Sequence, residues 1–384
     1  MLAQRRALSP LNPGFPRGAP VRRVPGRTPL PFPLRCSWSV VMNTWTGGVP
    51  PVPRGPLGRR AVLRGGLAAA LGLAGAGVLS GCGTGSPGAA KVEDTQKGTA
   101  GAVIRPIAER YGLVGELDLE HVAGTGPGDV QNKLLSGALD VASMGPIGAV
   151  VAAEARAAVS LFSTSLHNHV HWLVPENSPY RTVRDLRGKP IATPPNNSDA
   201  YRSAQLAAAV NDIDFETDYD VHQGAVLAGL ALFERGDVEA ILTIEPNATL
   251  LVGRGARELV SVQQLWSEGT GDGGRLLLNG QGATNEWIDA HPAQAAGIAR
   301  LRLAAHQVIA ENPAVLAELH EYYGIPAGER RAVELLPQRL ADVYPVVWDE
   351  SVFAGLRKQI DVAVRTGLIS AAPAAEPFRV VGRA

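Results

Sequence analysis

Two stretches of similar plan, Leu135–Ala142 (LSGALDVA) and Gly236–Pro246 (GDVEAILTIEP), decide the fold of this chain. In both, a helix with one apolar face leads to a glycine and an acidic residue. A short apolar run of strand character follows, and then a loop that contains a proline. Because helices that alternate with short buried strands are typical of α/β proteins, the pair predicts two α/β lobes of similar plan.

The two lobes are expected to be joined by two crossover strands. His169–Pro175 alternates along its length, and Gly274–Gln281 contains a run of leucines. Two connections allow the lobes to rotate about a hinge but not to separate. We therefore predict a first lobe over residues 98–175 and 277–384, and a second lobe over residues 176–276.

A third stretch, Asp185–Ala192 (DLRGKPIA), reads as a turn and a new strand. In this order and spacing the three stretches resemble the type II periplasmic-binding-protein superfamily, and within it the nitrate/sulfonate/taurine and thiamine-precursor binding group. The resemblance extends from Gly98 to about Gly324. It implies the two-lobed fold of the solute-binding proteins of ABC importers. Members often carry tryptophan before the Glu-Pro pair, where this chain has Ile244, so its ligand is expected to differ.

The ligand is expected between the lobes, because ligands of open α/β sheets bind beyond the carboxyl ends of the strands. The loops at those ends supply amide N–H groups and hydroxyls. The candidate ligand-binding residues are Gly98, Thr99, Thr125, Gly126, Ser143 and Met144 in the first lobe and Asn196, Asn197, Ser198, Thr243 and Glu245 in the second. Two alternatives stay open: Ser198 as a helix cap, and Glu245 as a surface or hinge carboxylate.

The front end has the character of an export signal. A basic patch that begins at Arg59-Arg60 precedes Leu67–Val78, which is apolar but shorter than the roughly 20 residues that span a bilayer. Leu79–Cys82 (LSGC) resembles the bacterial lipobox, in which the cysteine is acylated and becomes the mature N-terminus. The paired arginines leave open whether export follows the general or the twin-arginine route.

These features divide the front end into three predicted segments. Met42 would open a signal peptide of ordinary length, so residues 1–41 are interpreted as an over-extended start and residues 42–81 as the signal peptide. Residues 82–97 are predicted to be a tether, since Gly83–Ala90 is rich in Gly, Ser and Pro. Cys82 is the predicted lipidation site.

Charge is segregated along the chain, although the formal net charge is zero. Residues 1–81 contain eleven Arg and no Asp or Glu, which leaves 25 basic and 36 acidic residues in the rest. Nucleic-acid binding requires basic surface, so no nucleic-acid partner is expected. No cysteine follows Cys82, which excludes a cysteine nucleophile or cysteine metal site in the body.

Two other functions remain as alternatives. His167, His169 and His171 would share one face of a strand and could hold a divalent metal, although three histidines on a crossover strand are ordinary. A thiamine-pyrimidine-type enzyme is the second alternative. Its relatives use a cysteine-rich motif that this body lacks, and no nucleophile elbow is present.

The predicted function is therefore that of an extracytoplasmic solute-binding lipoprotein of an ABC importer, not an enzyme. The ligand is expected to be a small organic solute, sulfonate, nitrate/taurine-like or thiamine-precursor-like, and neutral, zwitterionic or a monoanion held by backbone amides. No cofactor or metal is predicted. The expected partners are the permease and ATPase subunits and, through the lipid anchor, the outer face of the cytoplasmic membrane. The protein is expected to be a monomer.

Overall fold

The computed structural model describes residues 88–155 and 157–382. The predictions for residues 1–41, for the signal peptide over 42–81 and for Cys82 lie outside these residues. The predicted tether needs a correction in its second half, because Ala90–Asp94 forms the strand β1. This strand escaped prediction because only its alternate residues Ala90 and Val92 are fully buried, so its apolar pattern is short.

The first lobe contains two small sheets. β1 pairs in parallel with β2 (Leu119–Ala123). The second sheet has the order β3-β10-β4 and is antiparallel, with β3 at Ala142–Met144, β4 at Val159–His167 and β10 at Leu277–Thr284. The chain therefore returns from the second lobe to supply the central strand of this sheet.

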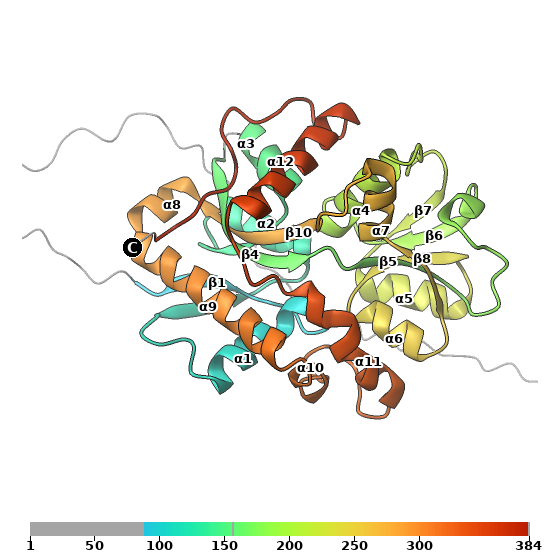
Figure 1. The fold of residues 1–384 in the computed structure, drawn as a ribbon, viewed down its shortest axis with the longest axis horizontal. Helices are drawn as coiled ribbons and strands as arrows, with labels where there is room; N and C mark the ends of the chain where they lie inside the picture. Colours follow the sequence, from blue (N-terminus) through green and yellow to red (C-terminus); the bar gives the residue numbers. More distant parts are fainter. Residues whose placement is uncertain (1–87, 156, 383–384) are drawn as a thin grey trace, which may run out of the picture. The chain divides into compact units, whose positions relative to one another are not determined.

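Helices cover these two sheets. They come from the N-terminal and the C-terminal parts of the described chain, on either side of the second lobe in sequence (Figure 1). α2 begins with Pro127, a position where the missing N–H of proline costs nothing. The helices of the first lobe are η1 (Ala100–Val103), α1 (Ile104–Arg110), α2 (Pro127–Leu135), α3 (Pro146–Glu154), α8 (Asn285–Ala290), α9 (Pro292–Glu311), α10 (Val315–Glu318), η3 (Ala341–Val343) and α12 (Glu350–Arg365).

The second lobe is built on one five-stranded sheet with the order β7-β6-β8-β5-β9. Its strands are β5 (Val170–Val174), β6 (Pro190–Thr193), β7 (Asp220–Gln223), β8 (Ala240–Ile244) and β9 (Arg257–Ser261). The central strand β8 is apolar and buried throughout, as expected for a strand covered on both faces. The edge strand β7 is polar and largely exposed.

Helices lie on both faces of this sheet. Figure 1 shows α4 and α7 on one face and α5 and α6 on the other. α5 ends at Gly236, which adopts a left-handed conformation with φ of 75°. The helices are η2 (Val183–Leu186), α4 (Asp199–Ala209), α5 (Val226–Arg235), α6 (Asn247–Gly253) and α7 (Val262–Thr270).

The crossing between the lobes lies earlier than predicted. β4 belongs to the sheet of the first lobe and β5 to that of the second, so the chain crosses at Asn168 and His169. The predicted boundary at residue 175 is therefore wrong by one strand, because β5 pairs with β8 and β9. The return crossing lies between α7 and β10, which begins at Leu277.

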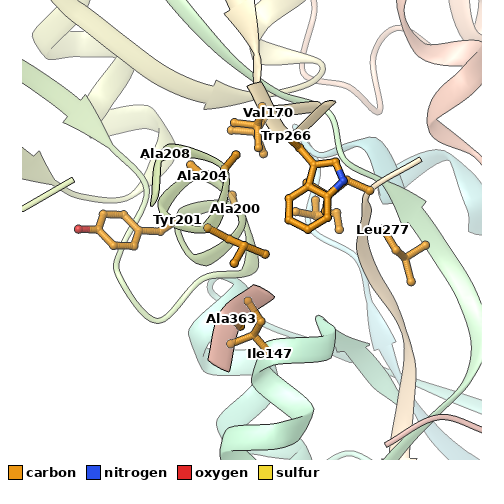
Figure 2. Packing of buried hydrophobic residues seen from close by; sticks show 14 of the residues in the cluster. Ile147, Val170, Ala200, Tyr201, Ala204, Ala208, Trp266, Leu277 and Ala363 are labelled. Atoms are coloured by element: carbon orange, nitrogen blue, oxygen red, sulfur yellow. The ribbon is translucent and has the colours of Figure 1, made fainter. Parts of the chain in front are cut away.

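The largest hydrophobic core cluster is continuous through both lobes. Figure 2 shows Ile147 of α3 and Ala363 of α12 facing the α4 residues Ala200 and Ala204, with Trp266 of α7 nearby. Apolar contacts of this kind stabilise a closed arrangement in proportion to the area that they remove from water. The remaining helix, α11 (Arg330–Leu340), follows the first-lobe helices in sequence but packs on α6 of the second lobe.

None of the helices within residues 88–155 and 157–382 combines the length and the apolar character that a membrane span requires.

Candidate functional site

A cavity of about 90 Å³ lies where the two lobes meet. The first lobe contributes the segment after β1, the start of η1, the loop before α2 and parts of β3 and β4. The second lobe contributes the start of α4 and the end of β8. His169, at the crossing, and β10 complete the wall. The cavity therefore lies at strand ends and helix starts of both lobes, as the fold class predicts.

Three of the predicted binding residues line this cavity: Thr99, Gly126 and Ser143. Thr99 precedes η1 and makes no side-chain cap hydrogen bond; its hydroxyl donates to the carbonyl oxygen of Gln96 at 2.8 Å. The backbone N–H of Ser143 donates to Glu93 Oε2 at 2.8 Å. Contact between these residues and a ligand stays a prediction.

The other candidates of the first lobe lie outside the cavity wall. Met144 is fully buried in the main core cluster. Gly98 joins the lobes through its backbone, because its carbonyl accepts from Asn247 Nδ2 at 3.1 Å. The backbone N–H of Thr125 donates to the side chain of Asp129 at 2.8 Å. All three were predicted from their position at strand ends, which does not determine where a side chain points.

The second-lobe candidates also serve local structure. Ser198 caps α4, since its hydroxyl accepts from the backbone N–H of Tyr201 at 3.2 Å, which confirms the alternative interpretation as a helix cap. Thr243 is 2% exposed within β8. The backbone N–H of Asn196 donates to Gln223. Asn197 packs on the first turn of α2, where a Cβ at Gly128 would lie 2.3 Å from its Nδ2 atom.

Glu245 is a buried structural carboxylate, so the alternative interpretation as a surface carboxylate is wrong. It is fully buried and does not line the cavity. Its Oε2 accepts from the backbone N–H and the hydroxyl of Thr249 at 2.9 and 2.6 Å. Its Oε1 accepts from Nε of Arg339, on α11, at 2.8 Å. The prediction that Glu245 binds the ligand is therefore wrong, because both oxygens are already satisfied.

Acidic side chains dominate the cavity. Glu93, Asp94 and Asp199 line it, and none of its described lining residues is Lys or Arg. Burial raises the pKa of Asp199 from 3.8 to about 6, although the charge of Arg202 and the N–H of Gly145 oppose this shift. The cavity is therefore negatively charged at neutral pH and favours a ligand that carries a cationic or donor-rich group.

His169 adds an acceptor rather than a charge. Its Nδ1 lies 2.8 Å from the carbonyl oxygen of His167, so Nδ1 carries the proton and Nε2 is the acceptor. Burial lowers its pKa from 6.5 to about 4, which keeps the ring neutral at pH 7.

Backbone N–H groups at the cavity are hydrogen-bond donors, and so are opposite in polarity to its acidic side chains. The first-turn amides of Ala100 and Gly101, in η1, and of Ala200, in α4, have no protein acceptor among the described residues. All three residues line the cavity. Helix starts of this kind favour anionic groups. The cavity thus offers amide donors to an anion and acidic side chains to a cation.

The lobes touch around the cavity. Gln131 Nε2, in α2, donates to Asp199 Oδ1 at 3.1 Å, and Asn168 Nδ2 donates to Ser203 Oγ at 2.8 Å. A Cβ at Gly145 would lie 2.6 Å from Asp199 Oδ1, so the start of α3 lies directly on the start of α4. The two lobes are therefore in direct contact beside the cavity.

The three histidines do not form the cluster that the metal-binding alternative requires. His167 ends β4, where its Nδ1 lies 2.9 Å from the carbonyl oxygen of Asp342, and His171 lies in β5, hydrogen-bonded to Glu258. The expectation that all three share one strand face is wrong, because the chain changes sheets between them. Within residues 88–155 and 157–382, no group of three or more His, Cys, Asp or Glu side chains is placed to hold a metal ion.

Residues 105–267 match the family model described as "ABC transporter, phosphonate, periplasmic substrate-binding protein". This part of the chain is similar to the substrate-binding domains of ABC transporters. Such domains lie outside the cytoplasm, bind a small ligand and work with a permease and an ATPase. No curated protein matches the chain in sequence.

Solved structures share the fold of this chain. The alkanesulfonate-binding protein SsuA from Xanthomonas axonopodis pv. citri, bound to MOPS, aligns with a TM-score of 0.62 at 20% identity, over 77% of this chain and 99% of that one. The aliphatic sulphonate-binding protein SsuA from Escherichia coli aligns with a TM-score of 0.56 at 20% identity, over 75% and 96%. The desulfurization enzyme DSZB aligns with a TM-score of 0.51 at 14% identity, over 75% and 95%. The two-lobed type II fold predicted from the sequence is confirmed.

Three acidic residues of the binding domain escaped prediction. Glu93 and Asp94 end β1, a strand that the sequence assigned to the tether. Asp199 directly follows the predicted helix cap, and an acidic residue there is an ordinary feature of a helix start. A signal for Asp199 existed nevertheless, since the predicted cleft loop runs straight into that helix.

Proposed function

We propose that this protein captures a small zwitterionic organic solute of the aminoalkanesulfonate type for an ABC importer. One observation carries the proposal: a cavity between the lobes combines free first-turn amides with acidic side chains and contains no Lys or Arg among its described lining residues. A plain anion would meet Glu93 and Asp199, and a plain cation would leave the amides unsatisfied. A zwitterion satisfies both sets of groups.

The comparisons support the sulfonate half of this ligand. Two neighbours are named as sulfonate-binding proteins, and one of them is bound to MOPS, a sulfonate that also carries an amine. The matched family is named for phosphonates, whose head group has a similar tetrahedral shape. Ile244, which stands where members of the resembled group often carry tryptophan, supplies an apolar wall.

Binding without chemistry is part of the proposal, although DSZB, an enzyme, shares the fold. His169 lines the cavity with a pKa of about 4, so it is a weak general base at neutral pH. No cysteine nucleophile is available after Cys82. We therefore propose capture and release of an unaltered solute.

Isothermal titration calorimetry with taurine tests this ligand class. Taurine should bind at least about tenfold more tightly than ethanesulfonate, which lacks the amine, and than ethylamine, which lacks the sulfonate, because each deletion leaves one set of buried groups unpaired. Equal affinity for taurine and ethanesulfonate would refute the zwitterion proposal. Binding of ethylamine alone would point to a cationic solute instead.

We also propose that the protein is a monomer held at the membrane by lipid on Cys82. Acyl chains contribute about 0.8 kcal/mol per buried CH₂, and two or more chains anchor a protein stably. Cys82→Ala should therefore move the protein from the membrane fraction to the soluble fraction, whereas Cys36→Ala should not. Membrane retention of the Cys82→Ala variant would contradict the anchor.

A further inference from the structure

The first lobe contains a second and larger cavity, of about 440 Å³, which we call the Arg302 cavity. It is bordered by β1, β2, α1, α9 and β10, and so lies within one lobe rather than between two. Its apolar wall is formed by Val92, Ile104, Leu119, Ile298 and Leu301. Its volume falls in the range of small-molecule sites, roughly 300–1,000 Å³.

Arg302, on α9, gives this cavity a cation without a protein partner. The residue is half-buried, and its guanidinium has no hydrogen-bond or ion-pair partner among the described residues. Burial lowers its pKa to about 10, and the nearby charge of Glu93 opposes this shift, so Arg302 stays protonated at neutral pH. A half-buried cation without a partner has lost part of its hydration, and an anion in the cavity would offset that loss.

Gln281 provides a second donor. It lies on β10, is 5% exposed, and lines the same cavity. Its Nε2 atom is buried and has no hydrogen-bond partner among the described residues. Buried polar groups are normally paired, so this amide and Arg302 are two unsatisfied donors at one cavity.

The acidic side chains around the Arg302 cavity already have hydrogen-bond or ion-pair partners in the protein. Glu93 accepts from the backbone N–H of Ser143, and lies too far from Arg302 for an ion pair. Asp94 and Glu109 pair with Arg105, at 3.3 and 2.9 Å, and all three of these side chains are substantially exposed. The two donor groups without a protein partner, those of Arg302 and Gln281, therefore belong to residues that line the cavity together with its apolar wall.

We propose that the Arg302 cavity is a second binding site, which takes a small organic monoanion with a short apolar tail. The charged head group accepts from Arg302 and Gln281, and the tail lies against the apolar wall. This site does not depend on the zwitterion proposal, because its ligand needs no ammonium group and its donors do not line the cavity between the lobes. Glu93 borders both cavities, so occupancy of one is expected to affect the other.

A crystal soaked with 4-bromobutanoate locates the site directly. The bromine gives an anomalous peak, and the peak is expected inside the Arg302 cavity, with the carboxylate within hydrogen-bond distance of Arg302. A peak only between the lobes, a peak only on the surface, or no peak would overturn the proposal. The wild-type protein suffices for this experiment, so it does not depend on whether a variant folds.

Calorimetry with butanoate tests the role of the charge. Arg302→Gln should weaken butanoate binding about tenfold or more, whereas Arg300→Gln, on the exposed face of the same helix, should not change it. Butanamide, the neutral analogue, should bind at least tenfold more weakly than butanoate to the wild type. Unchanged affinity in a folded Arg302→Gln variant, or equal binding of butanamide, would overturn the proposal. The circular-dichroism spectrum and the midpoint of thermal unfolding serve as the readout that both variants keep the wild-type fold.

Discussion

At the residue scale, the carboxylate of Asp199 meets groups of both lobes. It begins α4 of the second lobe, accepts from Gln131 of α2, and has the backbone N–H of Gly145 and the guanidinium of Arg202 close by. Burial nevertheless raises its pKa to about 6. An ammonium group of the ligand would replace the lost hydration and favour the ionised form.

Taurine binding should therefore weaken as the pH falls through about 6. At pH 5 roughly one-tenth of Asp199 is ionised, so the affinity should be about tenfold lower than at pH 7. His169, with a pKa of about 4, stays neutral over this range and does not add to the effect. Calorimetry at a series of pH values gives the profile.

Two variants make this assignment specific. Asp199→Asn should bind taurine more weakly at pH 7 and should show a flat profile between pH 5 and 7. Asp220→Asn, an exposed carboxylate of the same lobe, should keep the wild-type profile. A flat wild-type profile, or a wild-type slope in Asp199→Asn, would show that Asp199 does not meet the ligand.

At the element scale, α11 connects the C-terminal part of the chain to the sheet of the second lobe. Arg339 extends from α11 to Glu245 after β8 and to Glu258 in β9, at 2.7 and 2.9 Å. Burial alone would raise the pKa of Glu258, but the hydrogen bonds and charges of His171 and Arg339 outweigh it and lower the pKa to about 2. The network therefore needs the cation of Arg339 to hold two carboxylates in place.

Removing that cation should be costly. Arg339→Met should lower the free energy of unfolding by about 3–5 kcal/mol, because it leaves Glu245 buried without its charged partner. Arg331→Met, on the exposed face of the same helix, should change it by less than about 0.5 kcal/mol. Urea denaturation measures both. If both variants lose the same free energy of unfolding, the ion pairs of Arg339 contribute no stability of their own.

The elements themselves were largely predictable from the sequence, and the side chains of the site were not. α2 and β8 follow from their apolar periods and from the Pro and Gly residues at their ends, which are local signals. Whether β5 joins the first or the second sheet depends on pairing with β8 and β9, which lie far away in sequence. The misassignment of Glu245 and the omission of Asp199 have the same cause, because distant elements decide both: α11 satisfies Glu245, and the start of α3 packs on Asp199.

At the scale of the whole binding domain, one core cluster runs through both lobes, and the polar contacts around the cavity join the same elements. The lobes remain connected by the crossing at Asn168 and by the return to β10, so opening must be a rotation about these two segments. A ligand shifts this equilibrium only by its higher affinity for the closed form.

The distance between the lobes in solution tests the central claim, capture of a solute by closure, most directly. With Cys36 and Cys82 replaced by serine, spin labels at Glu120→Cys in β2 and Asp237→Cys after α5 occupy exposed positions in different lobes. Double electron–electron resonance should give a broad distance distribution without ligand, and saturating taurine should narrow it to one shorter distance. A distribution that taurine leaves unchanged, while calorimetry shows that taurine is bound, would contradict capture by closure of the two lobes.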